Sequence, residues 1–537
     1  MYNVVILVKG ISTEGVLKIC YQIKNGIEYA KTEGSSYRVG DKVLKKDVIY
    51  LGRVIDKKNN IFCNRERGTF SYDPDTGLFG KADEQYSSDL KSDGRKKIKS
   101  VLDFGDSFFI DQLIKDIHYD EVINQLSYRN KDTLKAMIQF YILSEATNSH
   151  AGTWYEGSFA SLLYPDANLT SQRISDFLES IGNMNEVNSF FDAHIAWVKK
   201  YVCNDNAIIV DSTGLPNQIS TPMTAISNHN GKVSNEIRMT VSLQRDSGYP
   251  LMFRLTPGNI VDMSTIERTV DALNQRNMDT DFSLLDAGYV TKENINQLFS
   301  AGIDFVARMP EKFTEYKNLV KHSSDLEQEE NLVEYKNRYV YIKQYEIEFG
   351  DQGHKVYAYL GKDIERSGDE THKMLKRQMK KKTDKATLHK ELQNSGLFAI
   401  MSSLPFKPDE ILEVYYIRQE VEQYFDLSKG SSKMIPLRVQ SEESIYGHLI
   451  LSMIASTINH YIDSKTERVS YNREEILMSL RNQKCLLYKN TVNTMEPQSK
   501  ANEYYREFNI KCPLHFIKNT TGKLTPIYHL EKHTQDM

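Results

Sequence analysis

Residues 206–214 read Asn206-Ala-Ile-Ile-Val-Asp211-Ser-Thr-Gly214, an apolar run that ends in an aspartate and then a turn. The run Phe282-Ser-Leu-Leu-Asp286-Ala-Gly288 repeats this design. A short, continuous apolar run bounded by turn residues is typical of a strand that is covered on both faces. Ends of adjacent central strands in an α/β sheet meet at one crevice. We therefore expect Asp211 and Asp286 to lie close together at that edge of a sheet.

The pattern around these two runs predicts a mixed sheet. Residues 236–245 and 249–255 alternate like strands and flank Asp246-Ser-Gly248, a turn signal. A helix over 263–277, a second helix over 291–300 and a strand over 303–308 follow. We therefore predict three antiparallel strands, followed by alternating helices and strands.

A third carboxylate is expected on a helix that begins near Glu413. Tyr415, Arg418, Glu422 and Lys429 lie within roughly 60° of one direction if this segment is a single helix with about 100° per residue. A tyrosine, two cations and a carboxylate on one face suit a polyanion that is held beside a metal ion. An amphipathic core helix does not need this set.

The spacing Y-x2-R-x3-E-x6-K of these four residues resembles the YREK signature of DDE transposases in the insertion sequence four superfamily. The resemblance implies a ribonuclease H-like core, with one aspartate on the first strand and one just past the fourth. Asp211 and Asp286 occupy those places here. It also implies a β-rich insertion before the helix that carries Glu422.

The resemblance further implies two-metal phosphoryl transfer. Asp211 would bridge two Mg²⁺ ions (or Mn²⁺), with Asp286 on one and Glu422 on the other, since carboxylate oxygens are hard ligands. Arg418 and Lys429 would bind DNA phosphates, and Tyr415 would hydrogen-bond or stack on the DNA. The expected enzyme is a DNA transposase that acts as a homodimer on terminal inverted repeats and joins their 3′ hydroxyls to target DNA.

The expected fold class is α/β: a ribonuclease H-like mixed sheet interrupted by a β-rich insertion, with N-terminal β-rich and helical DNA-binding regions. The patterns predict six segments: a β-rich domain and linker (1–125), a helical region with a possible helix-turn-helix at 157–181 (126–204), the first part of the core (205–310), the insertion with the basic helix Lys373–Lys382 (311–396), the second part of the core (397–464), and a C-terminal region without an assigned role (465–537).

Composition limits the class of protein. The net charge of −4 argues weakly against a nucleic-acid binder, but it averages over acidic and basic surfaces. Five separate cysteines without a C-x-x-C pair indicate reduced thiols and give no zinc signature. No apolar stretch reaches the roughly 18 residues that span a bilayer. Residues 1–9 lack a basic leader and resemble a strand, so we expect a cytoplasmic, nucleoid-associated protein without a membrane partner.

Other interpretations remain open. A single aspartate at a strand end is more often a turn or helix cap, and a lone helical glutamate is usually solvated. The basic run Lys373–Lys382 can be a solvated helix face. The insertion has no tryptophan, so a hairpin-processing step has no obvious base-holding residue there. Two further functions fit the same pattern: a metal-dependent DNA nuclease that does not join strands, and an inactive DNA-binding protein derived from a transposase.

Overall fold

The computed structural model describes residues 18–24, 27–33, 35–39, 42–46, 48–64, 66–82, 98–229, 232–259, 266–336, 338–380, 385–466, 471–519 and 522–528. The chain forms two compact units, Met1–Lys99 and Ser100–Met537. The strand expected at residues 1–9 and most of the basic segment 91–99 lie outside the described residues.

The first unit is a six-stranded antiparallel sheet in the order β1-β2-β5-β6-β7-β8. Its strands are β1 (Ile19–Lys24), β2 (Ile27–Thr32), β5 (Tyr50–Asp56), β6 (Ile61–Asn64), β7 (Gly68–Tyr72) and β8 (Phe79–Lys81), and the hairpin β3 (Ser35–Val39) and β4 (Lys42–Lys46) lies between β2 and β5 in the chain. Leu51, Phe62, Phe70 and Tyr72 form a separate small core. This unit therefore has its own hydrophobic cluster.

The second unit begins at Ser100, earlier than the boundary at residue 125 that the sequence predicted. Strand β9 (Ser100–Asp103) pairs with β20 (Lys484–Leu487), and helix α2 (Gly105–Asp116) packs against α17 (Arg473–Arg481). The C-terminal region completes this subdomain with β21 (Thr491–Thr494), α18 (Ser499–Glu507), β22 (His515–Lys518) and β23 (Leu524–Ile527) in a sheet of order β23-β22-β21-β20-β9. Residues 100–125 therefore fold with the end of the chain.

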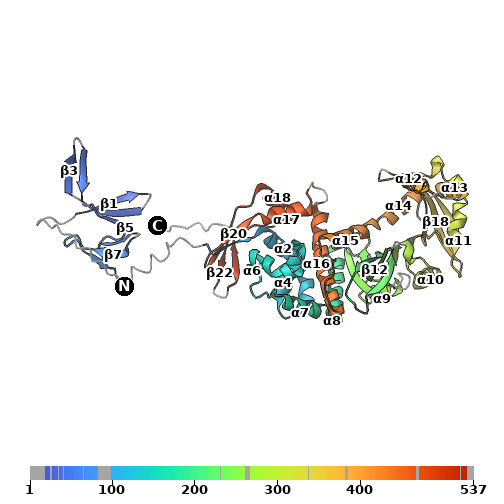
Figure 1. Cartoon of the computed structure of the whole chain (residues 1–537), viewed down its shortest axis with the longest axis horizontal. Helices are drawn as coiled ribbons and strands as arrows, with labels where there is room; N and C mark the ends of the chain where they lie inside the picture. The colour runs from blue at the N-terminus through green and yellow to red at the C-terminus, as the bar shows by residue number, and fades with distance from the viewer. Residues whose placement is uncertain are drawn as a thin grey trace. The chain divides into compact units, whose positions relative to one another are not determined.

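A ten-stranded sheet lies on the side of the second unit away from β20 and β22, where Figure 1 labels β12 and β18. Its order is β11-β12-β10-β14-β15-β19-β18-β17-β16, with β13 also paired to β12. The first strands are β10 (Ile208–Pro216), β11 (Ala225–His229), β12 (Lys232–Gln244), β13 (Pro250–Pro257), β14 (Phe282–Leu285) and β15 (Asp304–Arg308). Strands β10, β12 and β13 are antiparallel, whereas β14 and β15 run parallel to β10. The three antiparallel strands β10, β12 and β13 and the strands β14 and β15 were expected from the sequence, whereas β11 was not.

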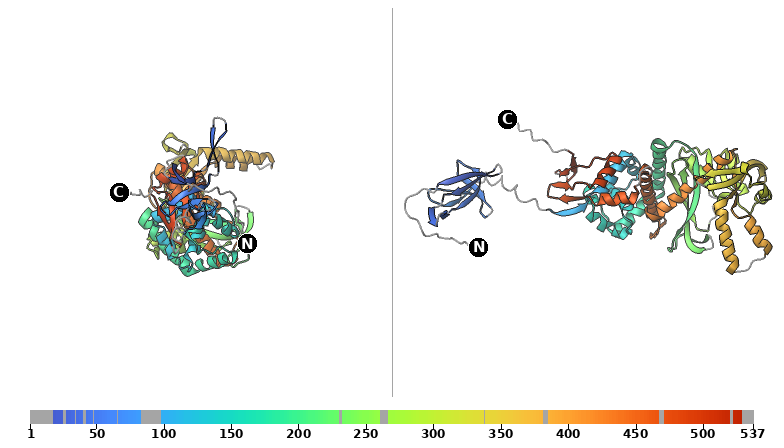
Figure 2. Two further views of the ribbon diagram at one scale, coloured as in Figure 1. Left: turned by 90° about the vertical axis from the view of Figure 1, so that its left-hand side faces the viewer. Right: turned by 90° about the horizontal axis from the view of Figure 1, so that it is seen from above.

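The insertion continues the same sheet. Strands β16 (Leu332–Tyr335), β17 (Arg338–Phe349) and β18 (His354–Asp363) are joined to β15 through β19 (Leu397–Ser402). Helices α12 (Ile364–Lys380) and α13 (Lys385–Gln393) then project side by side, which the right-hand view of Figure 2 shows. Of the predicted basic helix Lys373–Lys382, residues 373–380 form the second half of α12, and the last two residues lie outside the described part of the chain.

Helices surround this sheet and the C-terminal subdomain. They are α3 (Asp120–Gln125), α4 (Lys131–Leu143), α5 (Ala151–Gly157), α6 (Ala160–Leu163), α7 (Ser171–Ile181), α8 (Met184–Trp197), α9 (Ile266–Asn274), α10 (Lys292–Ala301), α11 (Thr314–Val320), α14 (Pro408–Tyr416), α15 (Gln419–Gly430) and α16 (Glu442–Thr466). The long apolar helix α16 packs against α4, α7, α8 and α15. It thereby connects the helical region to the glutamate-bearing helix α15.

The helix-turn-helix expected at 157–181 is not formed by two full helices. Only Ala160–Leu163 is helical in its first half, because the chain at Ser158 bridges to Asp103 and the Phe159 amide donates to the Asp103 carbonyl. Helix α7 does begin after Thr170, as predicted. It packs closely on α16, because Gly182 and Gly447 have no side chain at the crossing of the two helices.

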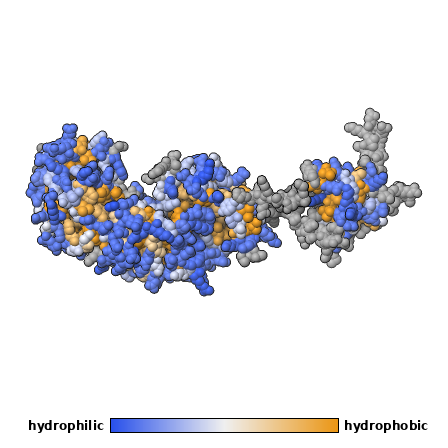
Figure 3. Space-filling model, turned by 180° about the vertical axis from the view of Figure 1, so that it is seen from behind, coloured by the Kyte–Doolittle hydropathy of each residue, from blue (hydrophilic) through white to orange (hydrophobic). Residues whose placement is uncertain are grey.

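The face in Figure 3 has mainly hydrophilic residues with smaller hydrophobic areas between them. Among the described residues, no helix is long and apolar enough to cross a membrane. The five cysteines are free thiols.

Candidate active site

Asp211 and Asp286 occupy neighbouring positions on two parallel strands. The pairing of β10 with β14 ends at Val210 and Leu285, and each aspartate is the next residue. The prediction that β10 ends at Asp211 was wrong. The strand continues to Pro216 because it stays paired with β12 over its whole length, although its ladder to β14 has ended. Asp211 therefore lies where one side of β10 loses its partner strand.

Tyr415 and Glu422 lie on two helices, not on one as predicted. Helix α14 ends at Tyr416 and α15 begins at Gln419. Between them, the amides of Arg418 and Val421 donate to carbonyls three residues back instead of four, which tightens the turn. Ile417 and Arg418 keep right-handed helical backbone angles, so the second helix follows directly on the first. Tyr415, Arg418, Glu422 and Lys429 therefore no longer share the face of one continuous helix. They stay near one another because α15 follows directly on α14.

The Arg418 guanidinium lies among three carboxylates. Its Nη1 atom is 3.2 Å from Asp211 Oδ2 and 3.5 Å from Asp286 Oδ1, and its Nη2 atom is 3.3 Å from Glu422 Oε1. One planar group thus contacts acids from β10, from the residue after β14, and from α15. The structure brings Asp211, Asp286 and Glu422 to one guanidinium, and their expected role as metal ligands stays a prediction.

The electrostatics of this cluster favour a fully charged Arg418. Burial alone would lower the pKa of its guanidinium, but the three carboxylates and the Tyr415 phenol raise that pKa above its ordinary value. The exposed fraction of the side chain is 16% for Asp211 and 62% for Glu422, so the cluster opens toward solvent at Glu422. A cation or phosphate can therefore reach it from the α15 side.

Lys429 and Tyr415 lie at the margins of the cluster. Lys429 Nζ donates to Thr213 Oγ1, and Thr213 lies on the same side of β10 as Asp211. Burial lowers the pKa of Lys429, although acids that include Asp211 oppose this effect. Tyr415 is buried, and burial raises the pKa of its hydroxyl. All six residues selected from the sequence are thus in or beside one region.

Arg308 is a nearby cation that the sequence interpretation did not select. Leu285 pairs with Ala307 in the parallel ladder between β14 and β15, so Asp286 and Arg308 are the next residues of the two strands. Arg308 lines a cavity of about 630 Å³ together with Tyr415, Arg418 and Glu422. The sequence could have indicated this residue. Arg308 is the last residue of the strand predicted at 303–308, and parallel strands end at the same edge of a sheet.

The donor set suits a hard divalent cation, but the present arrangement is closed by Arg418. Carboxylate oxygens are the ligands that Mg²⁺ and Mn²⁺ prefer. Across the part of the chain that the structure describes, no three His, Cys, Asp or Glu side chains are arranged to hold one metal ion. At the candidate site, Arg418 supplies the positive charge that the three carboxylates require. Binding of a metal ion there requires Arg418 to move away from them.

One family model matches the part of the chain that contains this site. Residues 203–458 match the family model described as transposase DDE domain. The matched region supports a DDE transposase. It covers just under half of the chain and includes Asp211, Asp286, the insertion and Glu422.

No curated protein matches the chain. Among solved structures, the chain is similar to the piggyBac transposase in a synaptic complex with hairpin DNA, determined by electron cryomicroscopy. The identity is 11% and the TM-score 0.37, over 70% of this chain and 78% of that chain.

Proposed function

We propose that this protein is a DNA transposase of an insertion sequence, which cleaves the ends of its element and joins the 3′ hydroxyls to target DNA. The observation that carries the proposal is the convergence of Asp211, Asp286 and Glu422 on one guanidinium within the residues that match a transposase DDE domain. Three acids held together at a cost in mutual repulsion are expected where a multivalent cation binds.

Asp211, Asp286 and Glu422 would hold two divalent cations, Mg²⁺ or Mn²⁺. When bound, these ions supply an activated attacking oxygen and stabilise the leaving oxygen. The carboxylates would set the positions of the bound cations and, through them, the orientation of the attacking group and the scissile phosphate. Asp211, at the point where β10 leaves β14, is the most buried of the three and the best placed to set this position.

Arg418 has two roles in this proposal. Without DNA it neutralises the three acids, which keeps the cluster compact. With DNA it pairs with a backbone phosphate, for which its planar group provides two donors. Lys429 and Tyr415 would contact phosphates on either side.

The finer assignment rests on the sequence resemblance. The order β13-β12-β10-β14-β15 supports the proposal of a ribonuclease H-like core, and the insertion sequence four type rests on the spacing of Tyr415, Arg418, Glu422 and Lys429 alone. We also propose that the protein acts as a homodimer on paired element ends, associated with the nucleoid in the cytoplasm. The N-terminal unit and the helical region would bind the terminal inverted repeats.

A plasmid that carries the gene with its natural flanking DNA tests the proposal. Full-length protein with Mg²⁺ should cut at the flanks, and pre-cut ends should be joined to a second plasmid. Glu422→Gln should retain DNA binding and lose cleavage by at least about 10³-fold, as expected when a group that acts only in the chemical step is removed. Asp426→Asn, one turn farther along α15, is the matched control and should cut normally.

Each alternative has its own result in this experiment. Cleavage without joined product would favour a nuclease. DNA binding by the wild type with no cleavage in Mg²⁺ or Mn²⁺ would favour a derived DNA-binding protein. Cleavage by Glu422→Gln at the wild-type rate would remove Glu422 from the site.

A further inference from the structure

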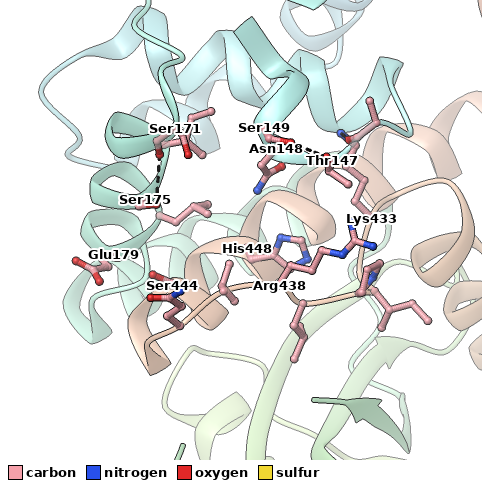
Figure 4. A pocket seen from close by; sticks show the side chains of 18 of the residues that line it. Thr147, Asn148, Ser149, Ser171, Ser175, Glu179, Lys433, Arg438, Ser444 and His448 are labelled. Carbon is pink, nitrogen blue, oxygen red and sulfur yellow. Dashed lines mark hydrogen bonds between the residues drawn. The ribbon is translucent and has the colours of Figure 1, made fainter. Parts of the chain in front are cut away.

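A second cleft begins where α15 ends. It has a volume of about 440 Å³ and lies between three segments: helix α7, the loop 145–149, and the loop 433–440 that leads from α15 to α16. Figure 4 shows Ser171 and Ser175 on one side of this hollow, Thr147, Asn148 and Ser149 on another, and Lys433 and Arg438 together on a third. We call the hollow between these three segments the α7 cleft. It does not include any of the candidate catalytic residues.

Two cations, Lys433 and Arg438, lie at one end of the cleft. Among the described residues, neither Lys433 nor Arg438 forms an ion pair with a carboxylate. Lys433 Nζ donates to the Ala146 carbonyl at 2.7 Å and lies over the Phe140 ring. Burial lowers the pKa of Lys433 to about 7, an energetic cost that an anion bound nearby would reduce. Arg418 differs, because its charge is already matched by three acids.

Hydroxyl and amide side chains form much of the remaining wall. They are Thr147, Asn148, Ser149, Ser171, Ser175, Gln440 and Ser444. Such neutral donors, together with Arg and Lys, make most protein contacts to the phosphates of DNA. The amino-terminal turn of α7 adds the positive end of a helix dipole. The composition of the wall is therefore that of a phosphate-binding surface.

The loop that carries the two cations is fixed in place. The Ser432 carbonyl accepts a hydrogen bond from Ser452 Oγ at 2.6 Å, and the Met434 carbonyl lies 3.3 Å from His448 Nε2. Leu437 and Val439 are buried on either side of Arg438, which is exposed. A ligand would therefore meet a preformed site and would not have to order this loop.

Two acids also line the cleft, at different distances from the cations. Glu179 accepts a hydrogen bond from Ser441 and lies on the α7 side in Figure 4, away from Lys433 and Arg438. Glu145 is close enough to Lys433 to oppose the lowering of its pKa. The anion-binding end of the cleft is thus the end at Lys433, and Glu145 weakens it in part.

We propose that the end of the α7 cleft at Lys433 and Arg438 binds a backbone phosphate of the DNA strand that enters the candidate active site. The inference rests on the proposed function and extends it to a contact outside the catalytic cluster. Eight positions of α15 lead from Glu422 to its last residue, Gly430, which corresponds to about 12 Å along the helix axis at 1.5 Å per residue, and Lys433 follows three residues later. Phosphates of one strand are about 3.4 Å apart along a duplex axis. The contact would therefore fall a few nucleotides from the cut.

The test measures binding of full-length protein to two labelled 40-base-pair duplexes, one from the DNA that flanks the gene and one of scrambled sequence. Arg438→Gln should weaken binding about tenfold, the usual effect of losing one charged hydrogen-bonding contact. It should also reduce the slope of log affinity against log salt by about one, the value for one lost phosphate contact. Arg438→Lys should restore the slope, because a charge remains.

Three matched variants complete the test. Lys433→Gln should reproduce the effect of Arg438→Gln, and Glu145→Gln should strengthen binding a few-fold. Lys489→Gln removes an exposed cation on the β20–β21 loop and should change nothing. Unchanged affinity and salt slope in both Arg438→Gln and Lys433→Gln, with thermal unfolding as in the wild type, would overturn the proposal.

The two proposals fail separately. If the wild type cuts flanking DNA and the cleft variants bind like the wild type, only the cleft assignment is wrong. If the wild type binds the scrambled duplex through Arg438 but never cuts DNA, the cleft assignment stands and the proposed reaction is wrong.

Discussion

The Nη1 atom of Arg418 lies 3.2 Å from Oδ2 of Asp211, although 207 residues separate them in the chain. The same nitrogen lies 3.5 Å from Asp286, and its neighbour lies 3.3 Å from Glu422. A single arginine therefore holds together the three acids that the proposed reaction needs. Its position implies competition between Arg418 and divalent cations for the same oxygens.

Replacing Arg418 should make the protein more dependent on divalent cations for its stability. In Arg418→Gln the three carboxylates repel one another without a compensating charge, so we expect a lower unfolding temperature in EDTA. Ca²⁺ or Mg²⁺ should then raise that temperature more than it does in the wild type, because ligand binding to the folded state stabilises it. Differential scanning calorimetry with and without metal measures both effects. An equal metal-induced shift in the two proteins would contradict the competition.

Arg308 should contribute to DNA cleavage without contributing much to folding. It ends β15 beside Asp286 and lines the cavity next to Arg418, so its charge is available to a phosphate. We expect Arg308→Gln to reduce the cleavage rate by about 10- to 100-fold, the loss of roughly 1.4 to 2.7 kcal/mol. The rate of flank cleavage at saturating protein measures this. Lys312→Gln, four residues farther and exposed, should cleave normally.

Acid should destabilise the second unit through two buried histidines. Burial lowers the pKa of both His194 and His448 to about 4, below the ordinary value of 6.5. The unfolded chain therefore binds more protons than the folded chain between pH 6.5 and 4, so stability is lost as pH falls through this window. Each histidine contributes up to about 3 kcal/mol of this loss.

His448→Gln tests the assignment. It removes one titrating group from the Tyr141 and Met434 contacts and should flatten the fall in unfolding temperature between pH 6.5 and 4. A pH profile parallel to that of the wild type would show that His448 does not control this acid sensitivity.

The crossing of α7 and α16 should not tolerate a side chain at Gly447. A Cβ atom there would lie 2.1 Å from the Leu178 carbonyl oxygen, far inside van der Waals contact. We expect Gly447→Ala to lower the free energy of unfolding by about 2 to 4 kcal/mol, since the helices must separate. Gly368→Ala in α12, where nothing lies within 4 Å, is the control and should be neutral or slightly stabilising. Equal unfolding temperatures for the two variants would contradict this packing.

The sequence predicted the strands and the acids of the candidate site because their signals are local. An apolar run followed by an aspartate marks β10 and β14 without knowledge of the rest of the fold. The break between α14 and α15 could not be predicted, because residues 413–430 contain neither proline nor an internal glycine, and the periodicity favours one helix. Arg418 was expected to face DNA, and its contact with Asp211 appears only when β10 and α15 are brought together.

The domain boundaries were harder to predict for the same reason. Nothing in residues 100–103 identifies a partner strand near residue 484, because pairing partners in a sheet carry no shared local signal. The first predicted helix of the helix-turn-helix fails at Ser158, where a contact with Asp103 replaces a helical turn. Both outcomes follow from long-range contacts made by one short strand.

The pairing of β9 with β20 has a consequence for synthesis of the protein on the ribosome. Strand β9 emerges early, but its partner is made only when nearly all of the chain has been translated. Until then β9 exposes an unpaired edge, and α2 lacks the packing surface of α17. A gene copy that is interrupted before the codons for α17 and β20 should therefore yield a misfolded product that is cleared by proteolysis, not a shortened protein that still competes for DNA ends.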